Sequence, residues 1–246
     1  MIKIDVIPYA SAVKNNWIKN KNVVIIDVLR MGSVILTGLA NGAKGFIPAA
    51  SVDKAIKISK NMDAGSCLLG GERDTKVIKG FTLGNSPFDY TKETVEDKTI
   101  ILTTTNGTVA IEASADAKKV FIGTFLNIKA LTEVLSNLEE VVLVCSGTNE
   151  QFSMDDGMCA AMIIDNLDRN HSLNLSDLAQ TLLQAYKSKS GNLKLLLKDC
   201  YHLNLLKRNG FEKDVTYCLQ TNIYDFVPEI KNTIVVKPKV TQKTSF

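Results

Sequence analysis

Short apolar runs alternate with helical patterns along the first two thirds of the chain. Three runs are rich in Val, Ile and Leu, and each precedes small polar residues and then a helical pattern: residues 22–29, 99–103 and 140–145. Such runs are typical of strands buried on both faces, as in parallel sheets. We therefore predict an α/β fold with a three-layer or similar arrangement around a mixed, largely parallel sheet.

Shorter elements are expected between these runs. The N-terminal segment MIKIDVIPYA reads as a strand, and so do residues 45–48, 66–69 and 119–123. Helices are expected to begin after Ser51 and Asn127, because Ser and Asn are favoured at helix N-caps. A further helix is expected over residues 155–167.

The C-terminal third has a different pattern and is predicted to be helix-rich. Residues 176–187 and 192–208 have helical spacing, whereas residues 215–219 and 233–236 read as strands. No linker rich in Pro, Gly or Ser separates this third from the rest. We therefore expect one α/β domain over residues 1–246.

Composition limits the classes of partner and compartment. The chain has 246 residues and a net charge of +3, which is too weak to indicate a nucleic-acid or membrane partner. No apolar run approaches the length of a transmembrane helix. The five cysteines are widely spaced without a CxxC pair, which favours reduced thiols in a cytoplasmic protein over a zinc site.

Polar residues gather at the predicted strand ends, where ligands bind in open α/β sheets. Asp27, Arg30 and Ser33 follow the first buried run, and Glu72 and Arg73 follow residues 66–69. A buried carboxylate needs a partner. Asp27 therefore either pairs internally with Arg30 or binds Mg²⁺, while Arg30 reaches an anionic substrate. The GGER segment is either a turn with a surface ion pair or part of the site.

The other predicted strand ends carry further candidates. They are Thr105, Asn106, Gly107 and Thr108 after the second buried run, Ser146, Gly147, Asp155 and Asp156 after the third, and Asn85 and Ser86 in a turn-rich stretch. The Thr-rich segment offers free N–H groups to an anion, although a simply capped helix start explains it as well. Asp155 and Asp156 could equally complement a helix dipole without any function.

Other catalytic signatures are weak or missing. Cys67 and Arg73 match the C-x5-R spacing of cysteine phosphatases, but the intervening Glu72 would repel phosphate. There is no Walker A motif, GxSxG elbow or HExxH motif. His171 and His202 lie in no Gly-rich or acidic context and are interpreted as ordinary helix or loop residues.

Five ordered motifs carry a resemblance to a known family. They are IDVLR (26–30), LLGGER (68–73), LGNSP (83–87), TTTNGT (103–108) and CSGTNEQFSMDD (145–156). Together they resemble the 2-phosphosulfolactate phosphatase (ComB) family over about residues 1–165. Arg-Met-Gly-Ser stands where the family often has Arg-Ala-Thr-Ser, and Asp155 stands where it often has Glu.

The resemblance implies a Mg²⁺-dependent phosphatase that converts 2-phospho-3-sulfolactate to 3-sulfolactate and phosphate, a step of coenzyme M biosynthesis. Asp27, Glu72 and Asp156, with Asp155, would hold the metal. Arg30 and Arg73 would bind the anionic groups, and Ser33, Asn85, Ser86, residues 105–108, Ser146 and Gly147 would complete the site. Attack by water is preferred over a phosphoryl-enzyme on Asp27, because the DxDx(T/V) pattern is absent.

Two other functions stay open: hydrolysis of a different small phosphorylated hydroxy acid, and non-catalytic anion binding. A homodimer is compatible with the sequence, which does not give the oligomeric state.

Overall fold

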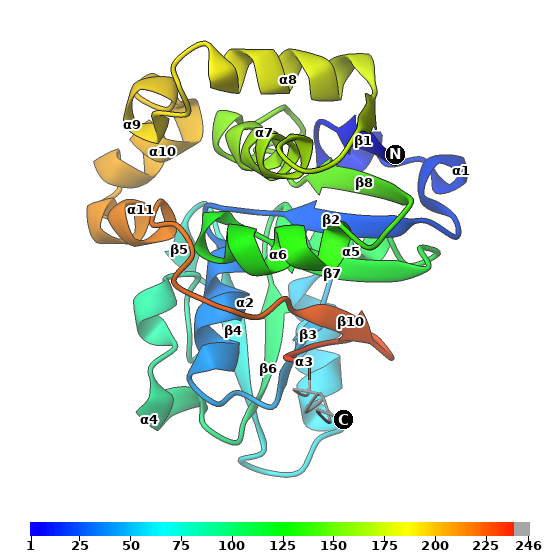
Figure 1. The fold of residues 1–246 in the computed structure, drawn as a ribbon. Helices are drawn as coiled ribbons and strands as arrows, with labels where there is room; N and C mark the ends of the chain where they lie inside the picture. Colours follow the sequence, from blue (N-terminus) through cyan, green and yellow to red (C-terminus); the bar gives the residue numbers. More distant parts are fainter. Residues whose placement is uncertain (239–246) are drawn as a thin grey trace, which may run out of the picture.

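The computed structural model describes residues 1–238. Their strands form one sheet in the order β5-β4-β6-β3-β11-β10-β7-β2-β8-β1-β9, with helices on both faces (Figure 1). The strands are β1 (Ile2–Ile7), β2 (Asn22–Ile26), β3 (Gly45–Pro48), β4 (Cys67–Arg73), β5 (Lys76–Val77), β6 (Thr99–Thr103), β7 (Lys119–Gly123), β8 (Glu140–Cys145), β9 (Leu173–Leu175), β10 (Glu229–Lys231) and β11 (Ile234–Val236). The predicted α/β class is confirmed.

The helices follow the predicted alternation over the first two thirds of the chain. They are α1 (Asn15–Ile18), α2 (Met31–Ala40), α3 (Val52–Lys60), α4 (Lys92–Val95), α5 (Gly107–Ala113), α6 (Ile128–Leu135), α7 (Met154–Asp168), α8 (Asp177–Lys187), α9 (Leu193–Leu196), α10 (Tyr201–Arg208) and α11 (Glu212–Cys218). Helices α8 to α11 confirm the helix-rich C-terminal third. No helix in residues 1–238 is long and apolar enough to cross a membrane.

The sheet consists of two half-sheets joined by a hairpin. The β2 half-sheet (β7, β2, β8, β1, β9) is entirely parallel, and the β4 half-sheet (β3, β6, β4) is parallel with β5 antiparallel at its edge. The β10–β11 hairpin joins them through two antiparallel pairs, Glu229 with Phe121 and Val235 with Phe46. The sheet is therefore mixed and largely parallel, as predicted.

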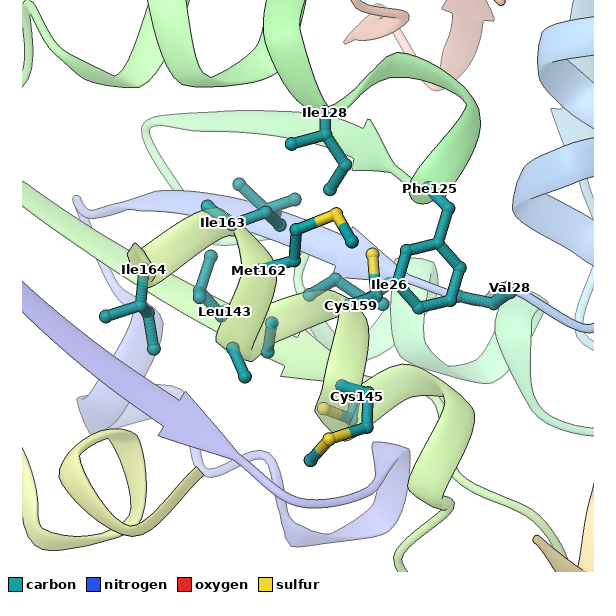
Figure 2. Close-up of a cluster of buried hydrophobic side chains, with 14 of the residues drawn as sticks. Ile26, Val28, Phe125, Ile128, Leu143, Cys145, Cys159, Met162, Ile163 and Ile164 are labelled. Atoms are coloured by element: carbon teal, nitrogen blue, oxygen red, sulfur yellow. The ribbon is translucent and has the colours of Figure 1, made fainter. Parts of the chain in front are cut away.

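Strand β2 lies at the centre of two cores, which explains its unbroken apolar sequence. Successive side chains of a strand point to opposite faces. Val24 and Ile26 therefore pack with α6 and α7, whereas Val23 and Ile25 pack with α2 and α5. Figure 2 shows the first core, in which Ile26 lies near Met162 of α7. This packing fixes where β2 ends and therefore where Asp27 lies.

Helix α2 is buried on all sides, with every residue from Met31 to Leu39 inside. Its core includes Ile25 of the β2 half-sheet and Phe46 and Ile100 of the β4 half-sheet. A helix with apolar residues all round is expected in such a surrounded position. Helix α2 thus connects the two half-sheets directly behind residues 27–30, which precede it.

Strand β4 runs beyond the predicted residues 66–69, so the interpretation of GGER as a turn is wrong. Gly70 and Gly71 pair in register with Leu102 and Thr103 of β6. Gly71 has a φ of 143°, and a Cβ there would collide with the Thr103 carbonyl oxygen, so glycine permits this close pairing. The reversal follows at Asp74-Thr75, whose positive φ values of 52° and 68° suit a two-residue hairpin loop.

Two further predictions in the C-terminal third are corrected. Residues 192–208 form two helices, α9 and α10, and not one. Residues 215–219 are not a strand, because Asp214, Val215 and Cys218 of α11 are buried at helical spacing. The strand predicted at residues 233–236 is confirmed as β11, and Ser51 caps α3 by accepting a hydrogen bond from Lys54 N.

Candidate active site

A cavity of about 230 Å³ lies at the carboxyl ends of the strands of both half-sheets. Its polar wall comes from the end of β4 and from the loops after β2, β4, β5, β6 and β8: Asp27, Arg30, Glu72, Asp74, Thr75, Asn85, Thr104, Thr105, Asn106, Thr148 and Asn149. Its opposite wall is one face of α10, made by His202, Leu205, Leu206 and the following Asn209. The site therefore combines strand ends, as predicted, with a helix that the sequence did not connect to them.

Asp27 is a buried carboxyl group that lines the cavity. Its Oδ1 accepts a hydrogen bond of 3.0 Å from Met31 N, at the start of α2. Burial, with the charges of Asp155 and Glu72, raises the pKa of Asp27 to about 7, against the opposing charge of His202 and the Met31 bond. Oδ2 accepts no hydrogen bond from residues 1–238 and lies beside Gly107, where a Cβ would collide with it. Asp27 thus has one oxygen available to a cation or a proton.

Glu72 connects the ends of β4 and β6. Its Oε1 accepts hydrogen bonds from Thr105 N at 3.0 Å and from Thr105 Oγ1 at 2.9 Å. Its Oε2 accepts one from Thr75 N at 3.0 Å. The carboxylate therefore holds two loops of the cavity wall together, while a part of it still lines the cavity.

Asp156 connects the ends of β2 and β8 in the same way. Its Oδ1 accepts from Val28 N and its Oδ2 from Gly147 N, each at 2.9 Å. Burial, together with the carboxylates of Asp155 and Asp27, raises the pKa of Asp156. Both oxygens are engaged by backbone, so this geometry favours a role in shaping the site.

Asp155 lies deeper and faces α10. Its Oδ1 accepts hydrogen bonds from Ser153 Oγ and from Cys200 Sγ, whereas Oδ2 is buried without a hydrogen bond and lies 3.6 Å from His202 Nδ1. Burial opposes the charged form, but the His202 imidazole holds the pKa of Asp155 below its usual range. Burial also opposes the charged form of His202 and so lowers its pKa, but the Asp155 carboxylate more than offsets this, and the pKa of His202 is raised overall.

His202 is a cavity residue that sequence reasoning missed, because we interpreted it as an ordinary residue. No motif surrounds it. The one signal is spacing: His202, Leu205, Leu206 and Asn209 follow the i, i+3, i+4, i+7 pattern of one helix face. That pattern indicates a face without saying what it contacts.

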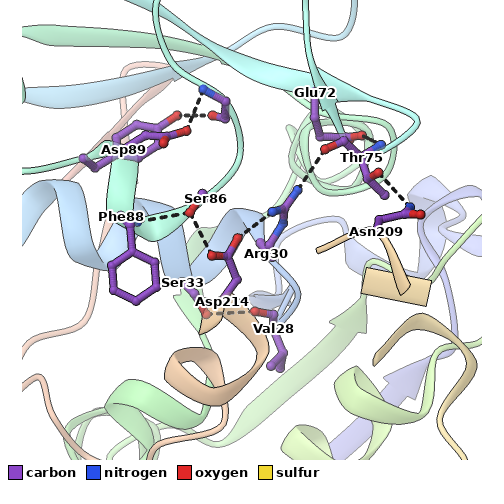
Figure 3. Close-up of polar contacts among 12 residues, drawn as sticks. Val28, Arg30, Ser33, Glu72, Thr75, Ser86, Phe88, Asp89, Asn209 and Asp214 are labelled. Atoms are coloured by element: carbon purple, nitrogen blue, oxygen red, sulfur yellow. Dashed lines mark hydrogen bonds and ion pairs between the residues drawn. The ribbon is translucent and has the colours of Figure 1, made fainter. Parts of the chain in front are cut away.

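Arg30 lies in the cavity wall but does not pair with Asp27, so the internal pair considered above is wrong. Its Nη1 donates to Asp214 Oδ2 of α11 at 2.6 Å, and both side chains are buried (Figure 3). Its guanidinium carbon lies 4.1 Å from the centre of the Phe211 ring, a cation–π contact.

The remaining predicted residues divide into two groups. Asn85, Thr105 and Asn106 line the cavity. The others support its walls: Ser33 Oγ donates to Val28 O, Ser86 Oγ to Asp214 Oδ1, Arg73 Nη2 to Thr103 Oγ1, and Thr108 N to Thr104 Oγ1, while Ser146 is buried and Gly147 donates to Asp156.

The cysteine-phosphatase reading of Cys67 does not fit the geometry. Cys67 and Arg73 lie at opposite ends of the extended strand β4, about 20 Å apart at 3.3 Å per residue. They cannot surround one phosphate group.

Within residues 1–238, no three His, Cys, Asp or Glu side chains converge as a ready-made metal site. The predicted set of Asp27, Glu72, Asp155 and Asp156 is therefore not a closed cage. The donor chemistry still fits Mg²⁺, which commonly takes one or two carboxylates and completes its shell with water and substrate oxygens. The open Oδ2 of Asp27, in a group whose pKa is raised by burial, is the oxygen best suited to hold it.

The fold and cavity define an α/β enzyme whose site, at the strand ends, suits a small polar substrate. The family model described as 2-phosphosulpholactate phosphatase matches residues 8–233. Proteins named "Probable 2-phosphosulfolactate phosphatase" are 41% identical in Clostridium beijerinckii (94% of this chain, 98% of that protein) and 41% identical in Clostridium novyi (98% and 100%). One from Clostridium perfringens is 44% identical (94% and 94%). The chain belongs to the 2-phosphosulfolactate phosphatase family, and is a phosphoric monoester hydrolase.

Proposed function

We propose that this protein hydrolyses 2-phospho-3-sulfolactate to 3-sulfolactate and phosphate, with Mg²⁺ held by Asp27. The observation that carries the proposal is Asp27 itself, a buried carboxyl group with one open oxygen in the strand-end cavity of a chain from this family. Burial, with the charges of Asp155 and Glu72, raises its pKa to about 7, and a bound divalent cation would favour the charged carboxylate.

The charges of the cavity support the need for a cation. Asp27, Glu72 and Asp74 line it, whereas the charge of Arg30 is already matched by Asp214. His202 faces the Asp155 carboxylate. A substrate that carries phosphate, sulfonate and carboxylate groups would meet net repulsion there. Mg²⁺, when bound, would neutralise charge on the phosphoryl oxygens and help to activate a water molecule.

The protein's own groups would then bind and orient the substrate. The hydroxyl group of Thr104 and the side-chain amides of Asn85, Asn106 and Asn149 surround the cavity as hydrogen-bond donors. Arg30 supplies a planar guanidinium suited to an anionic oxygen pair. Asp27 would remain a charged ligand and not a nucleophile, so we favour direct attack by water.

The substrate is tested by comparing phosphate release from 2-phosphosulfolactate, 2-phospholactate and p-nitrophenyl phosphate. We expect kcat/KM to be at least about tenfold higher for 2-phosphosulfolactate, because a discriminating ionic contact contributes about 1–3 kcal/mol. Equal rates on the three compounds would contradict the assignment, and a preference for 2-phospholactate would favour another phosphorylated hydroxy acid.

Metal binding is tested separately from activity, by titrating Mg²⁺ into the protein in a calorimeter. We expect Asp27→Asn to abolish binding and Asp63→Asn to retain it, because Asp63 is an exposed carboxylate outside the cavity. Equal binding by Asp27→Asn and wild type would contradict the role of Asp27.

The setting of the reaction is also a proposal. We place the protein in the cytoplasm, in coenzyme M biosynthesis. The thiols at positions 67, 145, 159, 200 and 218 are all free, which suits a reducing compartment. The homodimer remains a prediction.

A further inference from the structure

Helix α11 contributes no residue to the cavity wall, but it holds one that does. Arg30 is the only lysine or arginine among the described residues that line the cavity. Its ionic partner, Asp214, comes from α11, 184 residues further along the chain. We propose that Asp214 is a positioning residue, which fixes the Arg30 guanidinium so that its free N–H groups face the anionic substrate. The inference rests on the proposed function.

The contacts around Arg30 restrain it from several sides. Nη1 donates to Asp214 Oδ2 at 2.6 Å, and Nη2 lies 3.4 Å from the carbonyl oxygen of Thr75. The ring of Phe211 covers the guanidinium at 4.1 Å. Figure 3 shows Arg30 between Asp214 and the Glu72–Thr75 hairpin. Both the swing of the side chain and the plane of its guanidinium are therefore fixed.

Asp214 is itself oriented by a second partner. Its other oxygen, Oδ1, accepts a hydrogen bond of 2.9 Å from Ser86 Oγ. The chain Ser86–Asp214–Arg30 thus runs from the loop after β5, through α11, to the end of β2. Ser86 was predicted to bind substrate, and these hydrogen bonds give it an indirect role in holding Arg30.

A guanidinium has five N–H donors, and the protein engages one on each Nη. The remaining donors are available to a ligand in the cavity. An arginine held rigidly loses little side-chain entropy when it binds an anion, so its fixation lowers the free energy of binding. The alternative is that the pair only anchors α11 to the fold, and the two roles predict different kinetics.

The kinetic test uses Asp214→Asn, with Glu212→Gln as the matched control. Both remove one negative charge from α11, but Glu212 is exposed and makes no ion pair in residues 1–238. For 2-phosphosulfolactate we expect Asp214→Asn to raise KM about tenfold and to change kcat by less than about threefold. Ser86→Ala, which keeps the ion pair, should raise KM about twofold to threefold and serves if Asp214→Asn does not fold.

Unchanged KM in a folded Asp214→Asn variant, or in Ser86→Ala if only that variant folds, would overturn the proposal. An effect matched by Glu212→Gln would do the same.

The binding test does not depend on turnover. The chain has four arginines, at positions 30, 73, 169 and 208, so guanidinium NMR signals can be assigned with Arg30→Lys. Inorganic phosphate, titrated with Mg²⁺ present, should shift the Arg30 signals, and Asp214→Asn should weaken phosphate binding about tenfold. Arg30 signals that do not respond to phosphate would overturn the positioning role. Inactivity of the wild type on 2-phosphosulfolactate, with a normal Arg30 response, would instead contradict the proposed substrate.

Discussion

The two walls of the cavity are built in different ways. The strand-end wall is held by carboxylates that accept backbone N–H groups from adjacent loops, as Glu72 does from Thr75 and Thr105, and Asp156 from Val28 and Gly147. The helical wall, α10 with α11 behind it, is held by side-chain pairs that span long stretches of sequence, such as Arg30–Asp214 and Asp155–His202. The first wall fixes the negative charge and the shape of the cavity. The second wall closes the cavity and holds the Arg30 guanidinium.

The largest effect is expected at the strand-end wall. Asp27→Asn removes the charge that would hold the metal, while it keeps the side-chain volume. We expect kcat for 2-phosphosulfolactate to fall about a thousandfold or more, a loss of about 4 kcal/mol of transition-state stabilisation. Asp63→Asn should have wild-type kcat. A fall of less than tenfold in Asp27→Asn would show that the strand-end wall does not carry the chemistry.

The next effect is on the stability of the metal-free protein as a function of pH. The pKa of Asp27 is raised to about 7 in the folded state, from 3.8, so the folded state keeps a proton that the unfolded state releases. The stability linked to Asp27 is therefore fully present below pH 3.8, the pKa of the unfolded state, and is lost as the pH rises to about 7.

Urea unfolding of metal-free protein at pH 5 and pH 8 measures this loss. We expect wild type to lose on the order of 3 kcal/mol more than Asp27→Asn between these pH values, at about 1.4 kcal/mol per pH unit. A difference between the two proteins that does not depend on pH would contradict the raised pKa.

Glu72→Gln tests the connection between β4 and β6. The amide replaces one acceptor oxygen with a donor, so hydrogen bonds from Thr75 N or from Thr105 are lost. We expect a loss of about 2 kcal/mol in the free energy of unfolding, because a partly buried N–H is left without its acceptor. Glu133→Gln, an exposed change on α6, is the control and should alter stability by less than about 0.5 kcal/mol.

The smallest effect is expected at Asn209, which follows α10 in the helical wall. Asn209 Nδ2 donates to Thr75 Oγ1 at 3.0 Å, and Asn209 is exposed. We expect Asn209→Ala to raise KM by no more than about twofold and to lower stability by less than about 1 kcal/mol. A tenfold rise in KM would show that Asn209 binds substrate directly.

The strand-end wall could be predicted from the sequence because its residues directly follow apolar runs that indicate strands. The runs at residues 22–29 and 140–145 indicate buried parallel strands, and parallel strands bring Asp27 and residues 146–148 to one edge. Glu72 was placed there correctly, although in a strand and not in a turn, since the pairing of Gly71 with Thr103 is a tertiary contact.

The helical wall could not be predicted in the same way. Residues 215–219 were predicted as a strand, whereas the burial of Val215 and Cys218 at helical spacing and the packing of α11 against Arg30 show a helix. His202 has an ordinary sequence context, and its importance comes from the 3.6 Å approach to Asp155. Likewise, the choice of Asp214 over Asp27 as the partner of Arg30 depends on a contact between residues 184 apart.

The most direct test is phosphate release from racemic 2-phosphosulfolactate with Mg²⁺, then with excess EDTA, and then with Mg²⁺ restored. We predict release that EDTA abolishes and that Mg²⁺ restores, because three carboxyl groups line the cavity while the charge of Arg30 is already matched by Asp214. Release that EDTA leaves unchanged would contradict the role assigned to Asp27, and no release under any condition would contradict the proposed substrate.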